Sequence, residues 1–265
     1  MGLCWNITTR CNENCKYCHR FLGLADLSEE ENTLILERLV KDGVNTITWT
    51  GGEALLIPYL PRLMAKASAM GVTNRLITNG QLLTEPMVKQ LAPYLDRVSL
   101  SIDSFDSRLN QYMGRGSKHA DGVERAIYNL QTFAPDVKII VNSVVSKVTA
   151  NEDVFEVGEH LKNYNIETWK LFKFMPLREQ AVKSRELFEI SDEDYFATIN
   201  QLKAYFPEHN IDTRVDEDME TKYLLVLADG SVFKTENGAD KRLGNMLDLN
   251  FSVGEYVLET GSQKC

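Results

Sequence analysis

Three cysteines stand close together near the start of the chain, in a pattern that can carry chemistry. Cys11, Cys15 and Cys18 form a C-x3-C-x2-C run. Three thiolates in so short a stretch, with no fourth nearby, suit a [4Fe-4S] cluster bound through three irons, which leaves one iron open to a ligand that is not protein. A structural zinc site needs four ligands, and only His19 lies close by. Three clustered cysteines also cannot pair among themselves. The open iron predicts chemistry in addition to electron storage.

A second candidate site is the tripeptide Gly51, Gly52 and Glu53. It directly follows residues 46–50, whose β-branched and aromatic content predicts a strand. Glycines let the backbone approach a ligand closely, and backbone carbonyls with the Glu53 carboxylate suit an ammonium group. Taken alone, the tripeptide is equally well read as a tight turn.

Strands and helices alternate along most of the chain, and they must position these groups. Apolar periodicity and capping signals predict six strand–helix units. The expected strands are 3–7, 46–50, 75–78, 97–102, 138–145 and 167–174, and the expected helices are 28–41, 61–70, 85–91, 122–132, 152–164 and 192–205. Alternation at this spacing predicts an α/β fold with a parallel sheet and right-handed crossovers.

Unusual polar residues collect at or just beyond the carboxyl ends of the predicted strands. They are residues 11–18, 51–53, Asn79, 101–103, 142–143 and Lys170. Barrel enzymes build their active sites on this face. Lys170 shares one strand face with Phe172 and Phe174, where a lysine is costly unless it has an anionic partner.

The chain departs from this alternation after residue 174. We expect the charged segment 178–189 to be a solvated connector, with a lid over the site as the alternative. Residues 223–227 and 231–235, joined by Asp229 and Gly230, predict a β-hairpin that closes the open side of the sheet. The prediction is a single domain, with a core of residues 1–190 and a C-terminal extension of residues 191–265.

Composition limits the partners of the protein. A net charge of −9 argues against a nucleic-acid polymer, whose binding requires a basic stripe. No apolar run approaches the roughly 20 residues that span a bilayer, and the start has no signal-peptide layout, so no membrane partner is expected. An oxygen-sensitive cluster without an export signal predicts a cytoplasmic protein. Cys4 is expected to be buried in the first strand, and Cys265 to be a terminal thiol.

The cysteine run resembles the signature of the radical S-adenosylmethionine (SAM) superfamily, and residues 51–53 resemble its Gly-Gly-Glu. The resemblance implies an open (β/α)6 partial TIM-type barrel, with a [4Fe-4S] cluster and S-adenosyl-L-methionine as cofactors. Cys11, Cys15 and Cys18 would hold the cluster, and residues 51–53 would bind the methionine amino group. An electron donor such as flavodoxin or ferredoxin would reduce the cluster, which then cleaves SAM to a 5'-deoxyadenosyl radical that removes a hydrogen atom from a small-molecule substrate. Tyr17 is either an adenine contact or a shield for the cluster.

A longer pattern is similar to the viperin family, antiviral radical enzymes that dehydrate nucleoside triphosphates. It comprises Ser-Ile-Asp-Ser-Phe-Asp at 101–106, Gly-Arg-Gly at 114–116, and shorter stretches at 142–144, 169–172 and 223–227. The resemblance therefore covers nearly the whole expected barrel and the C-terminal extension.

The viperin resemblance also implies roles for single residues. Ser101 and Arg115 would contact the carboxylate and ribose side of SAM, and Asn142 would face the substrate or the cofactor ribose. Lys170 would bind substrate phosphate, and Tyr223 would border the substrate and pass a proton or hydrogen atom to the radical product. Taken singly, Ser101 is equally a strand-end hydroxyl, Arg115 part of a helix-terminating turn, and Asn142 an amide that satisfies backbone groups. The alternative for Tyr223 is a hairpin tyrosine packed on the barrel rim with its hydroxyl in water.

Some positions depart from the family pattern. Three positions at which viperin-like enzymes carry cations for the triphosphate are Thr46, Ile140 and Thr168, and Ala54 replaces the usual proline after the glutamate. The candidates to replace the missing cations are Lys138, Lys173, Arg178 and Lys183.

Three functions remain open from the sequence. The first is dehydration of a nucleotide to a 3'-deoxy-3',4'-didehydro nucleotide. The second is a radical enzyme of the same scaffold that acts on a nucleotide fragment, a sugar or a peptide, which the missing cations favour. The third is an iron–sulfur protein without radical chemistry, against which the intact motifs argue. Radical enzymes with a second cluster are disfavoured, because Cys265 is the only cysteine of the C-terminal extension.

Overall fold

The structure is a computed structural model that describes residues 2–215, 218, 224–236 and 239–256. These residues form one sheet of ten strands, in the order β10-β9-β8-β1-β2-β3-β4-β5-β6-β7. The strands are β1 Gly2–Asn6, β2 Thr46–Thr50, β3 Thr73–Thr78, β4 Leu95–Ser101, β5 Lys138–Val145, β6 Thr168–Lys173, β7 Ile211–Arg214, β8 Leu224–Val226, β9 Ser231–Glu236 and β10 Ala239–Asn245. The helices are α1 Glu29–Lys41, α2 Leu60–Ala69, α3 Glu85–Leu91, α4 Ser107–Met113, α5 His119–Phe133, α6 Glu152–Leu161, α7 Glu179–Lys183, α8 Arg185–Phe188 and α9 Asp192–Tyr205, with short 3-10 helices at Ala54–Leu56 and Ala92–Tyr94.

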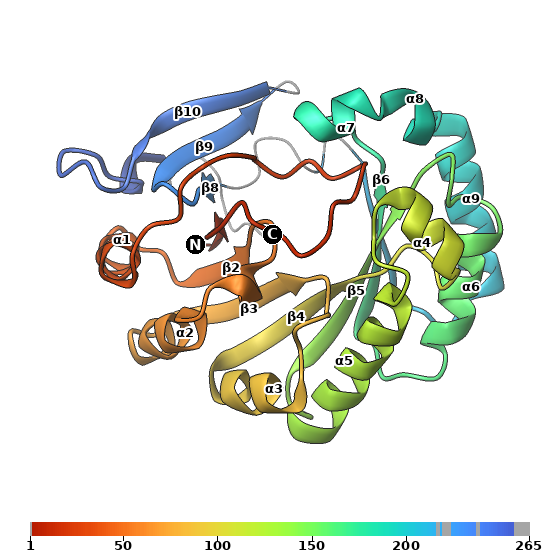
Figure 1. The fold of residues 1–265 in the computed structure, drawn as a ribbon, viewed down its shortest axis with the longest axis horizontal. Coiled ribbons are helices and arrows are strands. Elements are labelled where there is room, and N and C mark those ends of the chain that lie inside the picture. The colour runs from red at the N-terminus through yellow and green to blue at the C-terminus, as the bar shows by residue number, and fades with distance from the viewer. Residues whose placement is uncertain (1, 216–217, 219–223, 237–238, 257–265) are drawn as a thin grey trace.

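Strands β1 to β7 pair in parallel, each with the next in the chain, and this confirms the partial TIM-type barrel. Figure 1 shows α1, α2, α3, α5, α6 and α9 on the outer face of the curved sheet. The main core lies between these layers, where Trp5 of β1 stacks on Trp49 of β2 with ring centroids 5.0 Å apart. Among the described residues, no helix is both long and apolar enough to cross a bilayer.

Helix α1 begins as its capping signals predict. The Ser28 side chain accepts a hydrogen bond from the amide of Glu31, and the Glu31 carboxylate accepts one from the amide of Ser28. This reciprocal pair satisfies amides that the first helical turn leaves unbonded. Ile35, Leu36 and Leu39 then bury their side chains against the sheet. Four further elements have the bounds that the sequence predicts, namely β2, α3, β5 and α9.

Three elements differ from the sequence-based expectation. β7 adds a seventh parallel strand beside β6, α4 follows residues 101–106, and β10 pairs antiparallel with β9. β7 has four residues, of which Asp212 and Arg214 are charged. It therefore lacks the apolar β-branched run by which a strand is usually identified, and it forms because β6 offers an unpaired edge.

The prediction of a solvated connector at residues 178–189 is wrong. The segment folds into α7 and α8, and it buries Ala181 and Phe188 against the cysteine loop. The ring of Phe188 lies 5.4 Å from that of Tyr17, and the Gln180 side chain donates a hydrogen bond to the Cys15 carbonyl at 2.7 Å. The charged segment therefore packs on the cysteine loop because it carries these two apolar side chains.

The predicted hairpin is present, but it extends the sheet instead of closing it. β8 and β9 are antiparallel, and β8 pairs in parallel with β1. Within the described ranges, no strand pairing joins the two edges of the sheet, β10 and β7. A two-pronged ion pair also joins β10 to the segment after β6, because Arg178 donates to Asp240 at 2.8 Å through both Nε and Nη2.

One glycine segment holds the cysteine loop through its backbone on the β2 side. The amides of Gly52 and Glu53 donate to the carbonyls of Thr8 and Arg10 at 2.7 and 2.8 Å. A Cβ on Gly52 would lie 2.0 Å from the Arg10 carbonyl oxygen, which no side chain can do. The glycine is therefore required for the loop to lie against the end of β2.

A second glycine segment holds the same loop from the side of α4. The Asn14 amide donates to the Gly114 carbonyl at 3.1 Å, and a Cβ on Gly114 would lie 2.2 Å from the Asn14 carbonyl oxygen. Gly114 also has a φ of 89°, in the left-handed region that favours glycine. The cysteine loop is thus fixed between Gly52 and Gly114, two glycines at which a Cβ would clash with the loop.

Alanine substitutions within the Gly-Arg-Gly tripeptide test this packing. Gly114→Ala should lower the free energy of unfolding by about 2 kcal/mol or more, because it adds both strain and a clash with the loop. Gly116 has open space where its Cβ would lie, so Gly116→Ala should stay within about 0.5 kcal/mol. Denaturant unfolding measures both, and iron content after anaerobic reconstitution should fall only for Gly114→Ala. Equal effects of the two variants would contradict the packing argument.

Candidate active site

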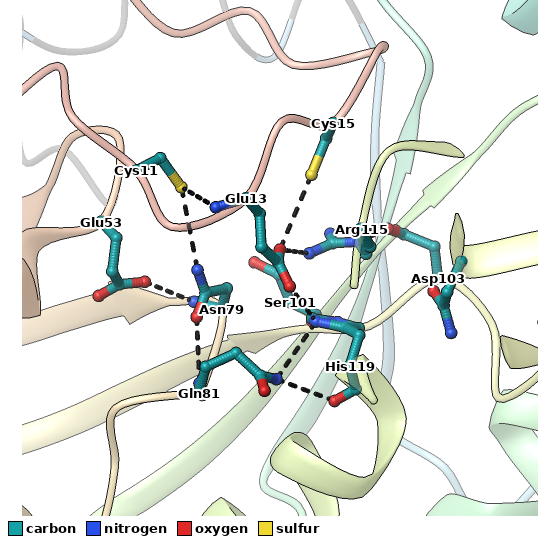
Figure 2. A network of polar contacts seen from close by, with 12 residues as sticks. Cys11, Glu13, Cys15, Glu53, Asn79, Gln81, Ser101, Asp103, Arg115 and His119 are labelled. Carbon is teal, nitrogen blue, oxygen red and sulfur yellow. Dashed lines mark hydrogen bonds and ion pairs between the residues drawn. The ribbon is translucent and has the colours of Figure 1, made fainter. Parts of the chain in front are cut away.

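The three cysteines lie on one loop between β1 and α1, at the carboxyl ends of the parallel strands. Figure 2 shows Cys11 and Cys15 of this loop. All three thiols are free; Cys15 is buried, and Cys11 and Cys18 are partly exposed. Burial raises the pKa of Cys11, and it raises the pKa of Cys15 to about 12. These thiols become thiolates only beside compensating positive charge, which iron supplies. Three uncrosslinked thiols on one clamped loop fit a [4Fe-4S] cluster with three protein ligands.

Glu13, between the first two cysteines, is an organising residue that the sequence analysis missed. Its carboxylate accepts a hydrogen bond from Arg115 Nη1 at 3.0 Å and lies 2.7 Å from His119 Nδ1. Burial raises its pKa, but the hydrogen bond from His119 and the charge of Arg115 outweigh burial, so the pKa of Glu13 lies below its usual value. His119 Nε2 in turn lies 2.9 Å from the Ser101 carbonyl. Figure 2 shows this chain of contacts running from the cysteine loop to the end of β4.

Arg115 lies at the centre of the same network. Its Nη2 donates to Asp103 at 2.7 Å, and its Nε lies 2.6 Å from the Tyr17 hydroxyl, which donates to Asp103. The Arg115 side chain is only 6% exposed. Burial alone would lower the pKa of Arg115, but Tyr17, Cys15 and the two carboxylates raise it well above its usual value. Arg115 therefore stays charged and neutralises the acidic groups beneath the loop.

The two predicted SAM contacts Tyr17 and Arg115 are thus brought together, but their polar atoms bind protein groups. Tyr17 is buried between Phe188 and this network, and burial raises its pKa well above the usual value. This position matches the shield for the cluster more closely than a free adenine platform. Their contacts to SAM remain predictions.

Glu53 is buried at the end of β2 and accepts several hydrogen bonds. Its carboxylate accepts from the amides of Leu55 and Asn79 at 3.1 and 2.9 Å and from the Thr78 hydroxyl at 2.9 Å. Burial raises its pKa to about 7, which these hydrogen bonds only partly oppose. A cationic ligand would stabilise the ionised form, so the site suits an ammonium group. The Asn79 side chain also reaches the loop, where it donates to Asn12 at 2.7 Å.

The predicted residues of β4, β5 and β6 form one row across the sheet. Ser101 pairs with Asn142, and Asn142 pairs with Lys170, so their side chains point to the same face. Asn142 Oδ1 is buried and accepts no hydrogen bond from a described residue. Burial lowers the pKa of Lys170, and the charge of Arg214 lowers it further. The row therefore contains a buried acceptor, Asn142 Oδ1, without a hydrogen-bond partner among the described residues, which suits a ligand.

Tyr223 lies outside the described residues, so its predicted role is not tested. The four cations proposed to replace the missing phosphate ligands are held elsewhere. Lys173 pairs with Asp192 at 2.6 Å, Arg178 with Asp240 at 2.8 Å, Lys183 with Glu179 at 2.6 Å, and Lys138 with Glu167 at 2.9 Å.

Removal of the Arg115 charge tests the buried network. Arg115→Met leaves the buried Asp103 without its cation and Glu13 with only His119 as a partner, and should cost about 3–5 kcal/mol of unfolding free energy. Arg62→Met breaks an ion pair on the surface, where the Arg62 side chain is 64% exposed, and should cost less than about 1 kcal/mol. Denaturant unfolding of the cluster-free proteins measures the difference. Similar losses in the two variants would show that Arg115 is not the organising charge.

The raised pKa of Glu53 predicts a pH dependence of stability. The folded state holds the Glu53 proton up to about pH 7, whereas the unfolded state releases it near the usual value of 4.5. The free energy of unfolding of cluster-free protein should therefore fall as pH rises from 4.5 to above 7, by up to about 3 kcal/mol from this group. Glu53→Gln cannot ionise, so the difference between wild type and variant across that range isolates the effect. A constant difference would contradict the assignment.

Comparisons with known proteins place these observations in a family. A family profile described as the Radical SAM superfamily matches residues 5–179. An S-adenosylmethionine-dependent nucleotide dehydratase of Flammeovirga pacifica is 30% identical, over 96% of this chain and 85% of that protein. One of Selenomonas ruminantium is 25% identical, over 94% of this chain and 91% of that protein. The solved structure named "Native anSMEcpe with bound AdoMet" has a TM-score of 0.73 at 20% identity, covers 98% of this chain and 80% of that chain, and is similar in fold.

The cysteine loop and the profile match agree on the cofactors, which are a [4Fe-4S] cluster and SAM. The match spans the cysteine loop, residues 51–53 and the Gly-Arg-Gly segment, which are the parts that the structure packs together. The chain therefore belongs to the radical SAM superfamily, and within it to the viperin-like enzymes whose curated members are named nucleotide dehydratases.

Proposed function

We propose that this enzyme dehydrates a nucleotide at its ribose. The observation that carries the proposal is the similarity to a nucleotide dehydratase along 96% of the chain. The positions that the resemblance assigns to SAM and substrate, Ser101, Asn142 and Lys170, lie in one row on the inner face of the sheet, below the cysteine loop. A similarity limited to the cluster motif would support only the superfamily.

The proposed reaction removes one hydrogen and one hydroxyl group from the ribose. The bound cluster and SAM supply a 5'-deoxyadenosyl radical, which takes the hydrogen atom from C4'. The 3'-hydroxyl then takes up one proton and leaves as water, and one further electron yields the 3'-deoxy-3',4'-didehydro nucleotide. An external electron donor supplies both the electron for SAM cleavage and the second electron.

The protein's own residues have four tasks in this proposal. Cys11, Cys15 and Cys18 hold the cluster, and Glu53 neutralises the methionine ammonium group. The packing of Phe188 over the loop keeps water from the cluster. Asn142 and Lys170 orient the substrate from below, because they present polar groups that no described residue binds.

A radical enzyme of the same scaffold with a different small substrate is the second candidate. The observation that favours it is the uncharged set Thr46, Ile140 and Thr168 at positions where viperin-like enzymes carry cations. A substrate with fewer phosphates, or with none, would not need those cations.

Anaerobic turnover separates the two candidates. Reconstituted enzyme with dithionite and SAM is offered each nucleoside tri-, di- and monophosphate separately, and 5'-deoxyadenosine is followed together with a product lighter by one water. The proposal expects one nucleotide to stimulate both products well above the background, and Cys15→Ala to abolish both. Background cleavage with every nucleotide would refute nucleotide dehydration and favour another substrate.

A further inference from the structure

The inner face of the barrel carries two arginines that the site described above does not use. Arg75 lies in β3 between Asn74 and Leu76. Asn74 faces the helices, since its side chain donates to the Met64 carbonyl of α2 at 3.0 Å, and Leu76 is buried in the same layer. Because side chains alternate along a strand, Arg75 points to the opposite face, into the barrel.

Arg97 of β4 lies beside Arg75 on the same face. The two residues are paired in the register of β3 and β4, and Val98, the next residue of β4, is buried in the layer under the helices. The side chains of Arg75 and Arg97 are 22% and 24% exposed. The Nε atom of each is buried and has no hydrogen-bond acceptor among the described residues. Two adjacent guanidinium groups therefore keep Nε–H donors without an acceptor, on side chains that are mostly buried.

Lys170 and Arg214 extend this positive region across β6 and β7. Lys170 faces the barrel, because its neighbour Trp169 is buried against Phe206 on the helix side. Arg214 pairs with Phe172, which shares the face of Lys170. After burial, the pKa of Lys170 is lowered by the charges of Arg214, Arg97 and Arg75, which lie close enough to act on it. Four cations thus converge from four strands.

The carboxylates facing these cations do not balance them. Asp96 lies 3.8 Å from Arg75, Glu167 lies 3.1 Å from Arg97 and 2.9 Å from Lys138, and Asp212 lies 2.5 Å from Arg214. With Lys138 included, five cations face three carboxylates among the described residues, which leaves two positive charges there in a chain whose net charge is −9. Like charges held together at such a site are costly unless an anion binds there.

We propose that Arg75 and Arg97, together with Lys170, bind the phosphate groups of a nucleoside polyphosphate inside the barrel. The inference rests on the proposed function and adds the phosphate site to it. Thr46 of β2 is uncharged where viperin-like enzymes carry a cation, and Thr48, two residues later, is in register with Arg75. The positive charge therefore lies on β3 instead of β2. Planar guanidinium groups bind phosphate oxygens through two parallel hydrogen bonds. The enzyme therefore keeps a polyphosphate site although the usual positions are uncharged.

Binding of inorganic triphosphate tests the site independently of turnover. Calorimetric titration of the reconstituted enzyme with SAM should show one site whose affinity weakens as salt is added. Arg75→Gln and Arg97→Gln should each weaken binding at least tenfold, whereas Arg62→Gln on the outer surface should leave it unchanged. Arg75→Lys keeps the charge but loses the paired hydrogen bonds of the guanidinium group, so it should weaken binding clearly less than Arg75→Gln, which separates loss of charge from loss of fold.

The outcomes distinguish this site from the proposed reaction. Absence of triphosphate binding by wild type, or equal binding by wild type and the two Gln variants, would overturn the phosphate site even if a nucleotide is dehydrated. Charge-dependent binding without any dehydration would uphold the site and overturn the reaction. If a nucleotide turns over, the Gln variants should raise its KM at least tenfold and change kcat much less. A kcat loss at unchanged KM would contradict phosphate binding.

Discussion

The backbone contact between the cysteine loop and two glycine segments is the constraint on which the rest of the site depends. Gly52 and Gly114 approach the loop so closely that a Cβ would lie 2.0 and 2.2 Å from its carbonyl oxygens. Hydrogen bonds from backbone to backbone give the loop one position, and they do not depend on side-chain rotamers. The same residues that bring the segments predicted to bind SAM to the loop therefore also orient the three thiols.

This docking creates an electrostatic problem that the buried network solves. Placing the loop on the barrel buries Glu13 and Asp103, and Arg115 is the cation that contacts both. Within the Gly-Arg-Gly tripeptide, Arg115 thus acts through its charge, and Gly114 acts through its lack of a side chain. Below it, Arg75, Arg97, Lys170 and Arg214 lie on the inner face of the sheet, so an acidic protein has a positive region inside its barrel.

The local features of this protein could be read from its sequence, whereas the long-range pairings could not. The cysteine spacing, the capping box at Ser28 and the alternation of strands and helices are patterns of neighbouring residues, and they led to the correct fold and cofactors. Glu13 and His119 are 106 residues apart, so their contact exists only after β1 and α5 are docked. A carboxylate inside the cysteine run was the signal that could have drawn attention to Glu13.

The sequence analysis gave a wrong prediction where a mostly charged segment contains a few buried residues. The segment 178–189 has many charged residues, yet Phe188 anchors it to the cysteine loop. The sequence analysis placed Arg75 and Arg97 only as members of two strands, because only the register of β3 and β4 puts them side by side on the inner face.

Transfer of deuterium from the substrate to the cofactor product is the most direct test of the account. The nucleotide that supports turnover is prepared with deuterium at C4', and the 5'-deoxyadenosine formed is analysed by mass spectrometry. The account predicts that 5'-deoxyadenosine gains one deuterium and that the dehydrated nucleotide has lost it. Unlabelled 5'-deoxyadenosine, formed while the nucleotide keeps its deuterium, would contradict hydrogen abstraction from the ribose.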